Sequence, residues 1–445
     1  FRFLVFSFFF SSSSRLHLQR RPTGGSRARS GSAAGEAGRP GPELPRQRWG
    51  LAAGERSPEA SEDALPLSRG GAALSGPSGR ALATPPRPSR GPVLGKVAVL
   101  CRRCLPRACL CRRAGQGCGR HYRAAICAEL KKPLTIEEVA PRSVGPQEVR
   151  VDVHFCGVNF ADILVCRGQY QEKPHLPFTP GLEFSGTVLE TGTDVSTVKE
   201  GDRVIGMRNF NCMAEECIID QKNLWQIPEK VSLQEAAVLP ISYGTAIFAL
   251  EHRAHTQPGE VVLVTAAAGA TGLAVIDVAT NVLQAKVIAA AGSDEKCKLV
   301  LQRGAQSSVN YSQGSLKDAV RKLVGKGGVN VAIDMVGGDV FLEALRSLAW
   351  EGRIVVVGFA GGNIASVPAN LLLLKNVSAM GLRYGQYKET KFPVFSKSLS
   401  SLLQYCQQGR IQPYVGMVSK LEEVNDAFLH VIQGKSMGKV LLALK

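Results

Sequence analysis

The first 120 residues of this 445-residue chain contain few acidic and few aromatic side chains. Between residues 11 and 120 the only aromatic residue is Trp49, and residues 64–128 include no Asp or Glu. A segment of this kind, rich in Gly, Pro, Ser, Ala and Arg, cannot bury enough apolar surface to offset the entropy that folding costs. The composition therefore predicts that residues 1–120 are disordered.

The absence of acidic residues in an arginine-rich tract is also typical of an organelle targeting segment. We expect a mitochondrial presequence that ends near residues 120–123, with a cytoplasmic protein that carries a disordered segment as the alternative. The apolar run at residues 1–10 is too short to cross a bilayer. We expect no transmembrane segment, and we assign no function to residues 1–90.

Excess positive charge is almost absent from the rest of the chain. The formal net charge is +17, but residues 1–120 hold 21 Lys and Arg against 6 Asp and Glu, whereas residues 121–445 hold 33 against 31. A nearly neutral folded part offers no electrostatic surface for nucleic acid. We therefore expect no nucleic-acid partner for it.

The cysteines form neither a disulfide framework nor a clear metal site. Cys101 and Cys104 have the spacing of zinc ligands, but no strand or turn pattern flanks them, so we expect no metal there. The seven cysteines from Cys127 to Cys406 are scattered, which fits a reducing compartment.

The most informative segment is residues 261–272, Val-Val-Leu-Val-Thr-Ala-Ala-Ala-Gly-Ala-Thr-Gly, followed by a helical pattern. The order strand, tight turn and helix is how α/β proteins bind a pyrophosphate on the free N–H groups of a helix N-terminus. Because Ala267 replaces the first glycine of the usual pattern, a simple turn of small residues is the alternative. We expect cofactor contacts from the residues of this turn, Gly269, Ala270, Thr271 and Gly272.

Apolar strands alternate with helices after this turn. The strands are expected at residues 286–291, 308–310, 329–336 and 353–358, and one of the intervening helices at 294–303. Buried strands that alternate with helices predict an α/β fold with a doubly wound parallel sheet, the Rossmann arrangement.

The end of the second strand indicates which cofactor binds. NAD-binding units place a carboxylate there for the ribose hydroxyls, and this chain has Gly292 and Ser293 instead. Lys296 offers charge to a 2′-phosphate, and Tyr311 is expected beside the adenine. This favours NADPH over NADH. The alternative is that Ser293 caps a helix, that Lys296 is solvated, and that Asp294 or Glu295 binds the ribose.

Short alternating strands precede the nucleotide unit. Residues 148–155, 184–192 and 201–206 predict a compact β-rich domain, and residues 438–444 predict a terminal strand that returns to it. We divide the chain into residues 1–120 (disordered), 121–240 (β-rich and catalytic), 241–375 (nucleotide-binding) and 376–445 (end of the nucleotide domain and return to the catalytic domain).

Several blocks resemble one family. From residue 123 to 445 the chain is similar to the medium-chain dehydrogenase/reductases of the zinc-free quinone oxidoreductase branch. The matching blocks are residues 156–162, 167–170, 180–186, 201–204, 239–246, 265–272, 334–338 and 438–440. The resemblance implies a GroES-like β-rich domain beside the Rossmann sheet, a small-molecule acceptor, and a homodimer.

The zinc ligands of the alcohol dehydrogenases in this superfamily are missing. Asn159 and Leu182 occupy the blocks in which the family resemblance places a zinc-binding Cys and His, and no Cys lies between Cys217 and Cys297. Without thiolate or imidazole ligands, tight zinc binding is not expected. We predict no metal ligands and no zinc.

A quinone or an enone can accept hydride without a metal if its developing oxyanion meets a hydrogen-bond donor. By resemblance, the donors and orienting groups are Asn159, Asp162 and Tyr170, with turn-capping, helix-start and rim positions as their structural alternatives. The resemblance also implies that Thr245, Gly358 and Phe359 contact the cofactor. A helix cap and a plain strand end are the alternatives for them.

Three departures from the family bear on function. Ala270 and Asp277 stand where a Gly and a Gln are usual, and Leu164 replaces a Tyr found in some members. Leu164 makes the site less suited to stacking a quinone. Three functions are therefore considered: an NADPH-dependent quinone reductase, a reductase of activated C=C bonds in enones or enoyl groups, and a non-catalytic NADPH-binding or RNA-binding protein.

Overall fold

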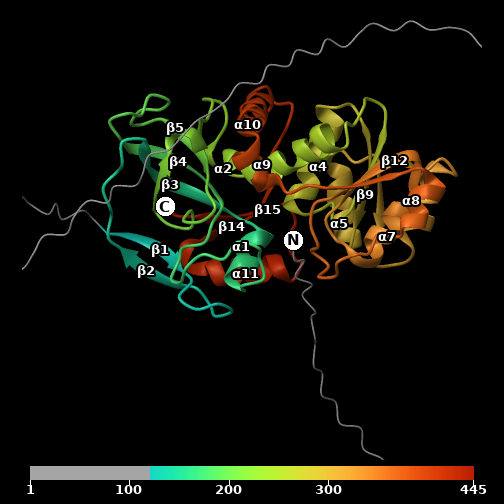
Figure 1. Ribbon diagram of the computed structural model, residues 1–445, viewed down its shortest axis with the longest axis horizontal. Coiled ribbons are helices and arrows are strands. Elements are labelled where there is room, and N and C mark those ends of the chain that lie inside the picture. The colour runs from blue at the N-terminus through green and yellow to red at the C-terminus, as the bar shows by residue number, and fades with distance from the viewer. Residues whose placement is uncertain (1–120) are drawn as a thin grey trace, which may run out of the picture. The chain divides into compact units, whose positions relative to one another are not determined.

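A computed structural model describes residues 121–445, and the predictions of disorder, targeting and metal binding for residues 1–120 lie outside them. The described residues form an α/β fold with a parallel sheet and a β-rich half, as predicted (Figure 1). The elements of the two halves are not contiguous in sequence, because the C-terminal strands belong with the β-rich half.

The nucleotide half is a six-stranded parallel sheet. Its order is β10-β9-β8-β11-β12-β13, so the strand order reverses beside β8, where ligands bind in sheets of this type. The strands are β8 (Val261–Val264), β9 (Lys286–Ala291), β10 (Ser307–Asn310), β11 (Val329–Asp334), β12 (Leu348–Val356) and β13 (Ser378–Gly381). The sequence predicted the first five and missed the edge strand β13.

Helices cover both faces of this sheet because both faces are apolar. In β8, Val262 and Val264 pack into one buried cluster and Leu263 into the other. Successive side chains of a strand point to opposite faces, so the continuous apolar run is what a doubly covered strand requires. The helices are α4 (Ala270–Asn281), α5 (Asp294–Gln302), α6 (Leu316–Val324), α7 (Gly338–Arg346) and α8 (Ala369–Lys375).

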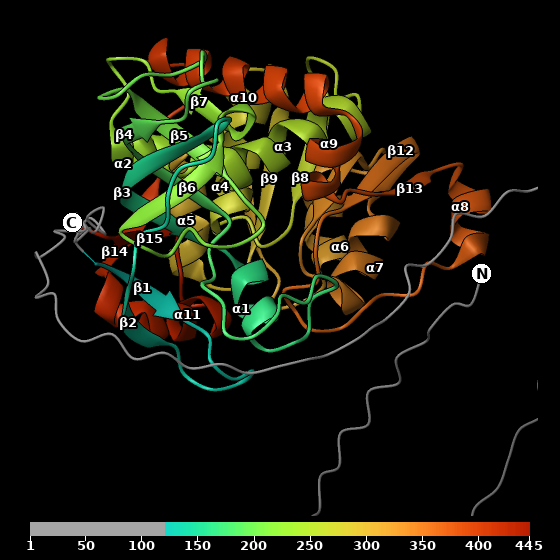
Figure 2. The ribbon, with the colours of Figure 1, turned by 60° about the vertical axis from the view of Figure 1, so that its left-hand side comes forward.

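The β-rich half is built around one long strand, β3 (Glu148–Val158), which pairs with β4, β6 and β15. The C-terminal strand β15 lies antiparallel to β3 although almost 300 residues separate them (Figure 2). The other elements are β1 (Tyr122–Ile126), β2 (Thr135–Val139), α1 (Phe160–Cys166), β4 (Glu183–Thr191), β5 (Arg203–Met207), β6 (Glu216–Asp220), η1 (Gln221–Asn223), β7 (Leu224–Gln226), β14 (Val415–Lys420), η4 (Leu421–Glu423), α11 (Val424–Ile432) and β15 (Lys439–Ala443).

A helical stretch joins the two halves. It comprises α2 (Leu233–Ala236), η2 (Leu239–Tyr243), α3 (Gly244–Ile247) and η3 (Phe248–Arg253), and α9 (Tyr384–Thr390) and α10 (Phe392–Gln407) lie beside it. Ser232 and Glu235 form a capping box at its start. Within residues 121–445 this stretch alone is long and apolar enough to cross a membrane, but 78% of its apolar window is buried in the protein, as in a core helix.

Candidate functional site

The turn between β8 and α4 has the geometry of a phosphate-binding turn. Gly269 is the N-cap of α4, and Ala270 and Thr271 form its first turn, where backbone N–H groups have no partner within the helix. A Cβ atom on Gly272 would lie 2.6 Å from the backbone of Ala266 and Ala267, so only glycine allows this close packing of helix against turn. The four predicted residues thus lie at a helix N-terminus, a place where anions can bind, and their cofactor contacts stay a prediction.

The carboxyl end of β11 lies next to this turn and is held by a buried carboxylate. Thr265 donates to Oδ1 of Asp334 at 2.8 Å, and the N–H of Gly337 donates to Oδ2 at 2.9 Å. Burial raises the pKa of Asp334. The segment after β12 folds against the residues that follow β11, since the N–H of Ala360 donates to the carbonyl of Met335 at 2.8 Å.

Gly358 and Phe359 therefore lie at the same carboxyl edge of the sheet as the Gly269 turn, because they follow β12 and β8 precedes that turn. The ring of Phe359 is close enough that a Cβ atom on Gly337 would lie 2.8 Å from it. Phe359 is 38% exposed, so part of its ring is free to contact a ligand. The cofactor role of the two residues stays a prediction.

At the end of β9, Ser293 caps α5 by accepting a hydrogen bond from the N–H of Lys296 at 3.3 Å. The ring of Tyr311 lies over Gly292, because a Cβ atom there would be 3.5 Å from the Tyr311 hydroxyl. Gly292, Ser293 and Tyr311 are thus together at one point of the sheet edge. The structure therefore shows Ser293 as a helix cap, which was the alternative to cofactor binding in the sequence analysis.

Two charged residues of α5, Asp294 and Lys296, form hydrogen bonds within the protein. The carboxylate of Asp294 accepts from Asn310 at 2.7 Å and from Gln313 at 2.9 Å, and these bonds lower its pKa. The ammonium of Lys296 donates to the carbonyl of Gly434 at 2.5 Å. None of these three bonds tests the expected 2′-phosphate contact of Lys296, which stays a prediction.

In the β-rich half, Asn159 belongs to a buried polar group with Glu183 and Lys439. The ammonium of Lys439 donates to Oδ1 of Asn159 at 2.8 Å and to Oε1 of Glu183 at 2.5 Å. The amide of Asn159 donates to the same Glu183 oxygen at 2.8 Å and to the carbonyl of Gly157 at 3.3 Å. Glu183 and Lys439 are at most 1% exposed, and Asn159 is 9% exposed.

This group was not foreseen from the sequence. Glu183 and Lys439 both lie in blocks that carry the family resemblance. Each block shows only one charged residue beside apolar strand residues, which does not indicate that the two charges meet. The available signal was the apolar run Val-Leu-Leu-Ala-Leu that directly follows Lys439. A lysine beside such a buried run is unusual unless it forms an ion pair.

Asp162 lies in the first turn of α1, the helix-start position that was its structural alternative, and its role toward a ligand stays a prediction. Its Oδ2 accepts from the backbone N–H of Asn159 at 2.8 Å. The side chain is buried, and loss of hydration raises its pKa from 3.8 to about 7, against the smaller opposing effects of the Asn159 N–H and of Lys439. Asp162 is therefore a positioning group rather than one open to a ligand.

Tyr170 and Thr245 occupy different surroundings. Tyr170 is half-buried, and burial raises its pKa, with Glu172 and Arg383 nearby. Thr245 is 8% exposed in α3, directly after Gly244, whose Cα faces the hydroxyl of Tyr384. Within the described part of the chain, that hydroxyl is buried without a hydrogen-bond partner. The ligand contacts expected for Tyr170 and Thr245 remain predictions.

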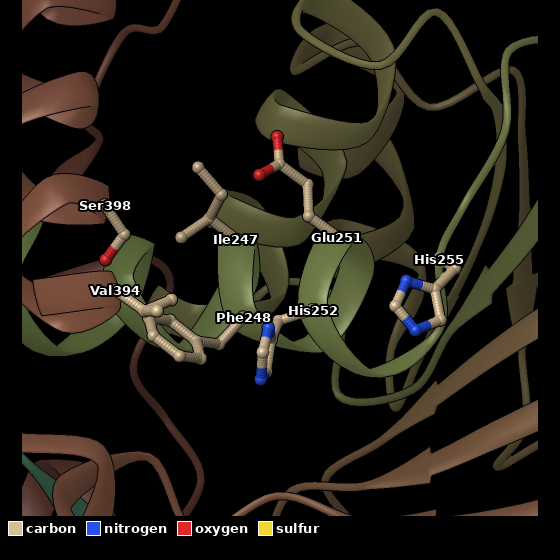
Figure 3. Close-up of a pocket in the computed structure, with 7 residues that line it drawn as sticks. All are labelled: Ile247, Phe248, Glu251, His252, His255, Val394 and Ser398. Carbon is tan, nitrogen blue, oxygen red and sulfur yellow. The ribbon is translucent and has the colours of Figure 1, made fainter. Parts of the chain in front are cut away.

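Within residues 121–445, no group of three or more His, Cys, Asp or Glu side chains is placed to hold a metal ion. A separate surface pocket of about 320 Å³ lies between the helical stretch and α10 (Figure 3). It is lined by Ile247, Phe248, Glu251, His252, His255, Val394 and Ser398. None of these residues was expected to bind a ligand.

Two family models match the two halves. The alcohol dehydrogenase GroES-like domain matches residues 145–245, and the zinc-binding dehydrogenase model matches residues 270–401. Quinone oxidoreductase-like protein 2 of Rattus norvegicus is 79% identical over 348 residues, which are 78% of this chain and 99% of that protein. Human quinone oxidoreductase is 32% identical, over 67% of this chain and 89% of that protein.

Solved structures share the architecture. A probable oxidoreductase from Mycobacterium abscessus is 31% identical, with a TM-score of 0.67 over 73% of this chain and 99% of that one. A mycobacterial structure described as complexed with NADPH is 28% identical, with a TM-score of 0.67 over 72% and 99%. The CurK enoyl reductase is 25% identical, with a TM-score of 0.66 over 73% and 98%.

Proposed function

Because this chain belongs to the quinone oxidoreductase branch of the medium-chain dehydrogenase/reductase family, we propose that it is a zinc-independent, NADPH-dependent reductase of quinones or similar electron-poor acceptors. The observation that carries the proposal is the Gly269 turn. It presents a free helix N-terminus at the point where the strand order of the parallel sheet reverses, which is where dinucleotides bind.

The end of β9 favours a phosphorylated nicotinamide. Gly292 and Ser293 provide no carboxylate for a ribose diol, and Asp294, the nearest acid, already accepts two hydrogen bonds. Ser293 keeps its hydroxyl proton for donation, because its oxygen acts as the acceptor in the helix cap. The similar mycobacterial structure with NADPH supports the same choice.

Bound NADPH supplies the hydride, and the chain's own residues orient the acceptor and stabilise the oxygen on which charge develops. Asn159 uses one N–H in a 2.8 Å bond to Glu183 and the other in a 3.3 Å bond to Gly157. The bond to Gly157 is long for an N–H···O hydrogen bond. It is therefore the bond that the oxygen of a bound substrate replaces at the least cost. Tyr170 offers a second donor, with a proton that its raised pKa retains.

Zinc independence is supported by the donor set around Asn159. A catalytic zinc needs thiolate, imidazole or carboxylate ligands with an open position. Here the ammonium of Lys439 donates to both Asn159 and Glu183, so the chain itself provides the cation at this place. Chelation is expected to leave turnover unchanged.

Reduction of activated C=C bonds is the second candidate, favoured by Leu164 and by the likeness to an enoyl reductase. A non-catalytic NADPH-binding or RNA-binding role is the third, and the near neutrality of residues 121–445 weighs against RNA. Mitochondrial location and a homodimer complete the proposal. The homodimer is supported by β13, which is an edge strand, and by exposed apolar residues in the segment between β12 and β13, Ile364, Leu373 and Leu374.

The test is a panel of NADPH-oxidation assays with quinones, enones and enoyl thioesters, together with zinc analysis. Turnover of quinones by protein that holds no stoichiometric zinc supports the proposal. Turnover confined to enones or enoyl thioesters favours the second candidate. Tight NADPH binding without turnover of any acceptor favours the third, and stoichiometric zinc contradicts the metal-free mechanism.

A further inference from the structure

The residue just before the C-terminal strand β15 touches the Gly269 turn directly. The N–H of Gly438 donates to the carbonyl of Ala268 at 2.8 Å, and Gly438 forms a parallel bridge with Gly269. Gly438 has φ +78° and lies so close to the ring of Tyr414 that a Cβ atom would be 2.4 Å from it. A side chain at this position would collide with Tyr414.

The next residue, Lys439, reaches the buried group in the β-rich half. Its ammonium bonds both Asn159 and Glu183. The second oxygen of Glu183 accepts from the N–H of Ile241 at 2.8 Å, in η2, four residues before Thr245. Two consecutive residues, Gly438 just before β15 and Lys439 at its start, therefore connect the turn at Gly269 with Asn159 and with the helical stretch.

Burial of this ion pair is not explained by stability alone. Removing two charges from water is costly, and apolar side chains of similar volume often give an equally stable core. The surroundings are also fitted to the pair, because a Cβ atom on Gly157 would lie 2.4 Å from Glu183 and 2.7 Å from Lys439. What the pair supplies, and an apolar pair would not, is a fixed direction for the Asn159 amide.

We propose that Lys439 is a positioning residue that couples the dinucleotide turn to the acceptor site. A pyrophosphate bound at the turn restricts the movement of Gly438. Lys439 then holds the side chain of Asn159 in the position that receives the acceptor. Through Glu183, Lys439 also fixes the backbone at Ile241. Cofactor binding thus prepares the acceptor site. This inference rests on the proposed function, because it needs a nucleotide at Gly269 and an acceptor at Asn159.

The test compares four full-length proteins: wild type, Lys439→Met, the double variant Glu183→Gln with Lys439→Met, and Lys445→Met. The double variant removes the unpaired buried charge that Lys439→Met alone would leave. Lys445→Met is the matched control, because it removes an exposed ion pair with Asp152 just beyond the end of the same strand. The measurements are thermal unfolding, NADPH titration, steady-state kinetics, and hydrogen exchange with and without NADPH.

We expect NADPH to slow exchange in wild type both at residues 266–273 and at the Ile241 amide. In the double variant, we expect NADPH still to slow exchange at residues 266–273 but no longer to slow it at the Ile241 amide. NADPH affinity stays within about twofold of wild type, whereas kcat/KM for the acceptor falls by about tenfold or more. Lys445→Met behaves as wild type.

A double variant that unfolds near the wild-type temperature and keeps the wild-type kcat/KM and exchange pattern overturns the inference and gives Lys439 a purely structural role. The wild-type arm separates this result from failure of the proposed function. If wild type binds NADPH and reduces an acceptor, only the coupling is at fault. If wild type does not bind NADPH, the proposed function and the coupling both fall.

Discussion

The hydroxyl of Tyr243 donates to Oδ2 of Asp277 at 2.6 Å, with both side chains buried. The same carboxylate accepts from Asn281 at 2.8 Å and from the backbone N–H of Gln412 at 2.7 Å. Asp277 stands where the family usually has Gln, and the sequence offers no reason for it. In the structure it ties α4, the helix that begins at the Gly269 turn, to η2 and to the segment before β14.

The Tyr243–Asp277 bond should contribute measurably to stability. Tyr243→Phe removes the donor and leaves a buried carboxylate oxygen with one partner fewer, so we expect a loss of about 1–3 kcal/mol in the free energy of unfolding. Urea unfolding of the two proteins measures this. Tyr405→Phe, at a partly buried ring outside this network, is the control. Equal stability of Tyr243→Phe and wild type would show that the bond is energetically neutral.

The sequence predicted the parts of the fold whose periodicity is strong. Long apolar runs such as residues 261–264 have few alternatives to a buried parallel strand. β13 was missed because Ser-Ala-Met-Gly, residues 378–381, has neither β-branched side chains nor alternation, and it becomes a strand only by pairing with β12. β14 was also missed, and in the structure it pairs parallel to β15.

The candidate site was predictable where residues close in sequence form it. Gly269 to Gly272 lie in one turn, and Asn159 and Asp162 are three residues apart. The Glu183–Lys439 pair is different, because 256 residues separate its members and only the return of β15 to the β-rich half brings them together. Nor does residue type reveal that Lys296 reaches the carbonyl of Gly434, on a loop 138 residues away.

The choice of NADPH over NADH is tested at the end of β9. Ser293→Glu with Lys296→Ala places a carboxylate where the 2′-phosphate is expected and removes a cation. We expect NADPH affinity to fall by about tenfold or more, which is about 1.4 kcal/mol, and NADH affinity to change less. Fluorescence titration with each cofactor measures both. Lys298→Ala, at an exposed lysine on the same helix, is the control. An unchanged NADPH affinity in the double variant would overturn the choice.

Asp162 gives stability a defined pH dependence. Its pKa is raised to about 7 in the folded protein from an ordinary value of 3.8, so the folded state binds this proton more tightly than the unfolded state. The stabilisation of the folded state that protonated Asp162 provides is complete below pH about 4, and it is lost as the pH rises to about 7. Asp162→Asn keeps an acceptor for the Asn159 N–H and cannot titrate.

We therefore expect the free energy of unfolding of wild type, relative to Asp162→Asn, to fall by about 2–3 kcal/mol between pH 5 and pH 8. Denaturant unfolding at several pH values measures the difference. Asp318→Asn, at an exposed carboxylate, should run parallel to wild type. A constant difference between wild type and Asp162→Asn would mean that Asp162 stays ionised throughout this range.

The last prediction concerns the edge of the nucleotide sheet. β13 pairs only with β12, and nearby Leu373 and Leu374 on α8 are 80% and 71% exposed. Unpaired strand edges and exposed apolar side chains are the features that association buries.

Leu373→Glu with Leu374→Glu would place two charges in the proposed dimer contact, and we expect the mass measured by light scattering to fall from that of a dimer to that of a monomer. The fold should persist, because both side chains point into solvent in the single chain. Leu301→Glu, at a 45% exposed leucine on α5, is the matched control and should remain dimeric. A double variant that keeps the wild-type dimer mass would place the contact elsewhere, and a monomeric wild type would refute the dimer.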